Sequence, residues 1–101
     1  MYQRTKTITD SLTRLMVTLY PQATETADLQ KAVNEHRGAL FRLERAAPLF
    51  VLSGAEAEEQ AEKLRADVVA TRAVELQAIH KALTFIMADC KQETAGLPAL
   101  I

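Results

Sequence analysis

The stretch that decides the fold is LQKAVNEHRGALFRLERAAPLF, residues 29–50. Its stripe-forming members follow one another at alternating gaps of four and three residues: Leu29, Val33, His36, Leu40, Leu43, Ala47 and Phe50. Because an α-helix completes a turn in about 3.6 residues, this spacing places all of them on one stripe of one helix. The stretch therefore predicts a long amphipathic helix that packs lengthwise against another helix.

A second stripe with the same spacing lies in VATRAVELQAIHKALTFIMADC, residues 69–90. Its apolar members are Val69, Leu76, Ile79, Leu83, Ile86 and Cys90, and Arg72 is its one polar member. Heptad spacing of this kind is typical of helices that pair along their length. We expect these six apolar residues to form the seam between two copies of the chain.

Three helices are expected, at about residues 8–20, 25–47 and 54–94. Thr7 with Asp10 resembles a capping pair for the first, and Pro21 should end it. Either Thr24 or Thr26 is expected to cap the second helix.

Other residues are expected to bend, begin or end the two long helices. Gly38, inside the second helix, is expected at a close helix crossing, and Pro48 either bends or ends that helix. The serine-to-glutamate spacing of residues 53–56 predicts a capping box for the third helix, and the glycine and proline of residues 96–98 should stop it.

The resulting fold class is all-α: one domain over residues 1–101, with a short N-terminal helix and two long antiparallel helices in a coiled-coil-like arrangement. A helix as long as the third cannot cover its stripe with one shorter helix and a short N-terminal segment. Each large apolar side chain left in water forgoes roughly 1.5–3 kcal/mol of burial free energy. We therefore expect a homodimeric helical bundle.

The amino-acid composition argues against several classes of function. The formal net charge is −1 and the pI is about 6.1, which argues against direct nucleic-acid binding. The longest apolar run, residues 49–52, is too short to span a bilayer, and no apolar signal core follows the N-terminus. A single cysteine agrees with a reducing compartment, so a cytoplasmic location is expected.

The side chains with potential chemistry are His36, His80 and Cys90. His80 and Cys90 lie ten residues apart on one expected helix, so a single chain does not bring them together. Zinc sites use four ligands, usually in closely spaced pairs, and no such pair is present. We therefore expect no catalytic residues, no metal and no cofactor, and a protein that is not an enzyme.

Two stretches carry a family resemblance. On the second expected helix, Ala32-Val33-x-x-His36-Arg37 precedes ERAAPLF at residues 44–50, and the third contains EL-x-A-x-x-x-AL-x-x-IM at residues 75–87. In order and spacing these motifs resemble TraM, the quorum-sensing antiactivator family of rhizobial conjugative plasmids. The resemblance implies a helical dimer that binds a LuxR-type transcriptional activator (TraR-like), blocks its DNA binding and so inhibits conjugal-transfer genes.

On that reading the first two helices present the partner-binding face, for which we expect Leu12, Leu15, Leu19, Leu29, His36, Arg37 and Leu40. The alternative is a small structural or adaptor protein of a phage or secretion assembly. It would share the stripes and the lack of catalytic residues. The two differ in partner behaviour, since an antiactivator forms a discrete complex with the activator and an adaptor builds larger assemblies.

Overall fold

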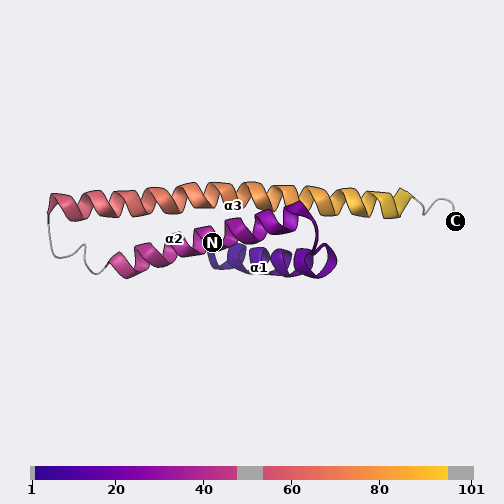
Figure 1. The fold of residues 1–101 in the computed structure, drawn as a ribbon, viewed down its shortest axis with the longest axis horizontal. Coiled ribbons are helices and arrows are strands. Elements are labelled where there is room, and N and C mark those ends of the chain that lie inside the picture. Colours follow the sequence, from indigo (N-terminus) through magenta and orange to yellow (C-terminus); the bar gives the residue numbers. More distant parts are fainter. Residues whose placement is uncertain (1, 48–53, 96–101) are drawn as a thin grey trace.

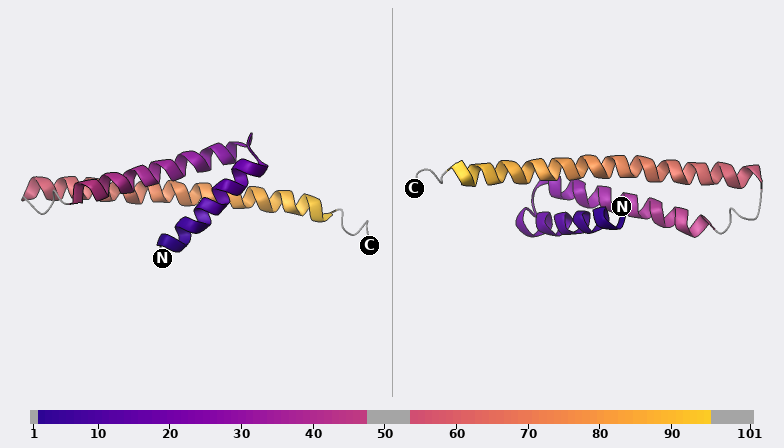
Figure 2. Two further views of the ribbon diagram at one scale, coloured as in Figure 1. Left: turned by 90° about the horizontal axis from the view of Figure 1, so that it is seen from below. Right: turned by 180° about the vertical axis from the view of Figure 1, so that it is seen from behind.

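The computed structural model describes residues 2–47 and 54–95 as three helices: α1 (Tyr2–Leu19), α2 (Thr24–Ala46) and α3 (Ala55–Ala95). α2 runs antiparallel to α3, and α1 crosses the α2–α3 pair obliquely (Figures 1 and 2). The molecule is elongated, with extents of 70 × 24 × 18 Å. The prediction of an all-helical fold with two long helices packed together is confirmed for the described residues.

α1 begins earlier than the sequence predicted. Thr7 does not cap the helix but lies inside it, where its hydroxyl donates to the carbonyl of Gln3 at 3.0 Å. Thr9 and Thr13 bond in the same way to the carbonyls four residues before them. These bonds satisfy each hydroxyl within the helix, so threonine is accommodated here without the break that capping would require.

The turn between α1 and α2 is closed by a threonine. α1 ends at Leu19, immediately before Tyr20 and the predicted stop at Pro21. The N-cap of α2 is Ala23, which makes no side-chain cap bond, so the capping role expected of Thr24 or Thr26 is wrong. Thr26 is buried and donates instead to the carbonyl of Tyr20 at 2.6 Å, which ties the first turn of α2 to the end of α1.

The two long helices start and end within one residue of the predicted bounds. With 41 residues, α3 is about 60 Å long at roughly 1.5 Å per residue. The predictions for Pro48, for a capping box beginning at Ser53 and for a stop at residues 96–98 lie outside the described residues, as does the stripe position Phe50.

The core lies where all three helices meet. Its buried members are Leu12 and Met16 of α1, Leu29, Ala32 and Val33 of α2, and Ala78 and Ala82 of α3. Tyr20, Ile79, Phe85 and Ile86 pack against this cluster and are partly exposed. The alanines let α2 and α3 approach closely, and the larger side chains of α1 and α2 fill the space that remains.

Gly38 does not mark a close crossing with α3. A Cβ built on it would meet, at 3.3 Å, only the guanidinium end of Arg42 on the same helix. The glycine is half-buried and lies in a shallow depression lined by Asn34, Glu35, Gly38, Arg42, Asp67 and Thr71. The expected packing reason for this glycine is therefore absent.

Candidate functional site

A row of large apolar side chains on α3 is exposed to solvent. Val69, Leu76, Leu83 and Met87, which we call the α3 stripe, expose 46–69 % of their surface. Leu76 and Leu83 each follow an inward-facing residue, Glu75 or Ala82, so they lie about 100° around the helix from the buried face. The α3 stripe therefore faces sideways from the α2–α3 pair, and about half of its surface or more is open to solvent.

The predicted seam is divided between two surfaces. Ile79 and Ile86 are partly buried and pack against the core of their own chain. Val69, Leu76, Leu83 and Cys90 are exposed. Alternate positions of one heptad stripe thus pack against the core, and the positions between them are exposed to solvent.

The predicted partner-binding residues also divide. Leu12, Leu29 and His36 are buried, at 7 %, 0 % and 2 % exposure, so they hold the fold together and do not form a surface for a partner. This placement corrects the expectation for those three: Leu12 and Leu29 pack in the cluster where all three helices meet, and His36 lies against Glu75 of α3. The exposed or half-exposed members of the set are Leu15, Leu19, Arg37 and Leu40.

A second exposed apolar surface lies on α1. Ile8, Leu15 and Leu19, which we call the α1 flank, are 56 %, 42 % and 57 % exposed. A shallow depression runs along it, lined by Ser11, Arg14, Leu15, Thr18 and Leu19. Leu15 and Leu19 were predicted from the sequence as surface residues; Ile8 was not, although it stands seven residues before Leu15.

A buried polar pair joins α2 to α3. His36 and Glu75 are each 2 % exposed, and the His36 Nδ1 atom lies 3.4 Å from the Glu75 carboxylate. Arg72, one turn earlier on α3, forms an ion pair with the same carboxylate oxygen. Arg72, the one polar residue of the heptad pattern, thus compensates the charge of Glu75, a buried acid that the pattern did not predict.

Further polar contacts fix α1 in place. Arg37 of α2 forms an ion pair with Asp10 of α1, so Arg37 holds two helices together. The ring of Tyr20 packs edge-on against Phe85 with ring centres 4.8 Å apart, and its hydroxyl donates to Asp89. This hydrogen bond raises the pKa of Tyr20 to about 12, because ionising the phenol would break it and place two negative charges together.

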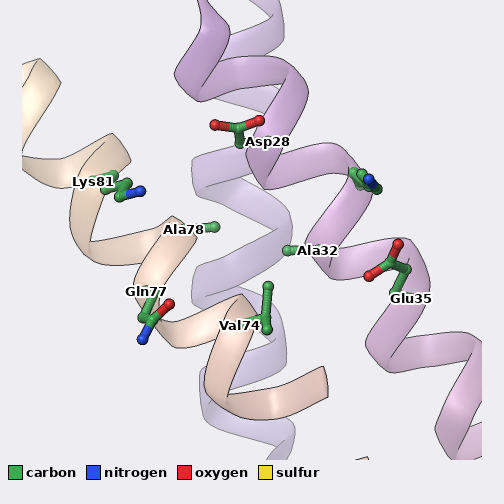
Figure 3. Close-up of a pocket in the computed structure, with 8 residues that line it drawn as sticks. Asp28, Ala32, Glu35, Val74, Gln77, Ala78 and Lys81 are labelled. Atoms are coloured by element: carbon green, nitrogen blue, oxygen red, sulfur yellow. The ribbon is translucent and has the colours of Figure 1, made fainter. Parts of the chain in front are cut away.

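A shallow groove of about 240 Å³ runs between α2 and α3. Figure 3 shows Ala32 and Ala78 pointing toward each other across it, with Val74 beside them and α1 passing behind. The rest of the lining is polar or charged: Asp28, Lys31, Glu35, Gln77 and Lys81. It contains no thiol, hydroxyl or imidazole that would serve as a nucleophile or a general base near neutral pH.

The candidate chemical residues are not assembled into a site. His36 is buried against Glu75, whereas His80 and Cys90 are exposed on α3. In residues 2–47 and 54–95, no three His, Cys, Asp or Glu side chains are grouped as metal binding would require. None of the described helices has an apolar stretch long enough to cross a membrane.

Comparison of the chain with protein-family models, with curated proteins and with solved structures found no match.

Proposed function

We propose that this protein is a non-enzymatic regulator that acts by binding other proteins, and that it works as a homodimer. The α3 stripe is the single observation on which the proposal rests. Its four side chains are about half exposed, so covering them stabilises the assembly by roughly 1 kcal/mol for each side chain. Val69, Leu76 and Leu83 are seven residues apart and Met87 follows four residues later, a spacing that suits a second helix better than a small molecule.

For the regulated partner we propose a LuxR-type activator whose DNA binding the protein blocks. The resemblance of residues 27–50 and 69–87 to TraM supports this partner. We assign the activator surface to the α1 flank together with Arg37 and Leu40 of the original partner-binding set. In this proposal the dimer holds the activator so that its two DNA-reading domains do not reach adjacent half-sites.

The direct test is a DNA mobility shift with a TraR-type activator and its promoter fragment. Adding the protein should abolish the shift, and gel filtration with light scattering should show a discrete complex. A Leu15→Asp variant should lose this effect, whereas Gln77→Asp, a change at an exposed position of α3 outside the α1 flank, should retain it. An intact shift at saturating protein would contradict the antiactivator role.

A structural or adaptor role is the second candidate, and one observation favours it. The last part of α3 extends beyond both α1 and α2 (Figure 1), and its residues 87–95 are exposed. Such an extension suits a helix that inserts into a larger assembly. Assemblies much larger than a dimer, in the absence of any activator, would favour this role over the antiactivator.

A further inference from the structure

α1 accompanies only one part of α3. Leu12 and Met16 pack in one cluster with Ala78 and Ala82, and Tyr20 reaches Asp89. Figure 1 shows α2 alone beside the first part of α3. We call these parts the three-helix end and the two-helix end; beyond the three-helix end, the last part of α3 continues without α1 or α2 (Figure 1).

The α3 stripe and α1 lie on the same side of the molecule. Val74 and Lys81, which line the groove of Figure 3, precede the inward-facing Glu75 and Ala82 by one residue, whereas Leu76 and Leu83 follow them. The α3 stripe is thus on the side away from the groove. α1 also passes behind the groove (Figure 3), and its N-terminal end projects past α3 on the side away from α2 (Figure 2).

Charge is distributed unevenly along α3. Residues 55–70 carry five acids, Glu56, Glu58, Glu59, Glu62 and Asp67, against the two bases Lys63 and Arg65. Residues 81–95 are balanced, with two lysines against Asp89 and Glu93. Two copies of this acidic section, residues 55–70, would repel each other side by side, because their charges would lie within the Debye length of about 8–10 Å.

We propose that the two copies of the dimer pair antiparallel along the α3 stripe, with the crossing centred near Leu76. This orientation rests on the self-association part of the proposed function. It sets each acidic section beside the balanced residues of the partner copy. It also places the α1 of each copy toward the two-helix end of the other. A parallel pair would instead place the two α1 helices at the same level along α3.

The antiparallel pair also separates the two α1 flanks. The two α1 helices then extend from the crossing toward opposite ends of the dimer, so the dimer presents two equivalent surfaces for a partner. A parallel dimer would place both flanks at the same end.

Cys90, the one cysteine of the chain, is an exposed probe of orientation. In a parallel pair the two copies of Cys90 would occupy the same heptad position and face each other. In an antiparallel pair centred at Leu76, the two Cys90 thiols would be about 40 Å apart, at roughly 1.5 Å per residue from the centre. Treating the wild-type protein with a short bismaleimide should then give no covalent dimer.

A second variant gives the positive signal. Glu62 lies as far before Leu76 as Cys90 lies after it, and both are exposed. A chain with Glu62→Cys and Cys90→Ser should not crosslink to itself. Co-expressed with the wild type, it should form a mixed crosslinked dimer, identified by mass spectrometry. Circular dichroism of the variant should match the wild type.

The outcomes separate the two proposals. A Cys90–Cys90 crosslink in a protein that sediments as a dimer overturns the antiparallel orientation and leaves self-association standing. A dimer that gives no mixed crosslink also overturns this orientation. A monomer at all concentrations overturns both the orientation and the dimer from which it follows.

Discussion

The three-helix end and the two-helix end of this molecule are built from different side chains. Where α1 joins α2 and α3, large side chains are fully buried, with Met16 and Leu29 at 0 % exposure. At the two-helix end the buried apolar residues are alanines: Ala39, Ala57 and Ala61. Two helices alone enclose little more than a line of small residues, so a third helix is needed to bury a leucine completely. The contrast locates the stability of the chain at one end and its uncovered apolar surface along α3.

The largest expected effect is the loss of a leucine from the three-helix end. Leu29→Ala should reduce the free energy of unfolding by roughly 3 kcal/mol, because the removed atoms leave a cavity among buried neighbours. The matched change Leu64→Ala, at a half-buried position of the two-helix end, should cost roughly 1 kcal/mol. Urea denaturation of both variants measures the difference. Equal losses would mean that the two ends are packed alike.

The buried polar pair, between the two ends, should give the next largest effect. Glu75→Ala leaves His36 and Arg72 without the carboxylate that both contact, so we expect a loss of about 2 kcal/mol. In a double-mutant cycle with His36→Ala, the double variant should lose about 1 kcal/mol less unfolding free energy than the sum of the two single losses. Glu59→Ala, an exposed acid of the same helix, is the control. Strict additivity would show that His36 and Glu75 do not interact.

A smaller effect of opposite sign is expected at Gly38. Gly38→Ala should raise the free energy of unfolding by about 0.8 kcal/mol, because alanine favours the helix and the new Cβ meets only the flexible end of Arg42. Thermal unfolding followed by circular dichroism measures it. Destabilisation would indicate that α2 and α3 approach each other more closely at this position than the structure shows.

The smallest effect concerns the Tyr20–Asp89 contact at the three-helix end. Because the pKa of Tyr20 is raised from 10.0 to about 12 in the folded protein, its contribution is complete below pH 10 and is lost as the pH rises toward 12. The melting temperature of the wild type should therefore fall more steeply over this range than that of Tyr20→Phe. Parallel curves for the two proteins would show that the Tyr20 hydroxyl does not contribute to stability.

How far the sequence predicted this structure depends on whether a feature is periodic. The bounds of α2 and α3 followed from heptad spacing and from helix-ending residues, because both signals are local. The start of α1 did not, since threonines that bond back to carbonyls in their own helix resemble caps in sequence. Glu75 was missed because nothing local distinguishes a buried glutamate from one on a solvated face.

The candidate surface shows the same limit. Periodicity identified Leu76 and Ile79 as members of one stripe, but a stripe spans a range of angles around the helix. The position of α1 decides that Ile79 packs inward while Leu76 stays exposed. That division depends on tertiary packing. Tertiary packing also buries Leu12, Leu29 and His36, which were predicted to lie on the partner-binding face.

Sedimentation velocity tests the central claim, that a second copy covers the α3 stripe. The wild type and Gln77→Arg, a change at an exposed position of α3 outside the stripe, should both sediment as dimers at micromolar concentration. Leu83→Arg should sediment as a folded monomer, because it introduces a charge into the seam. A wild type that remains monomeric, or a Leu83→Arg variant that remains a tight dimer, would contradict the account.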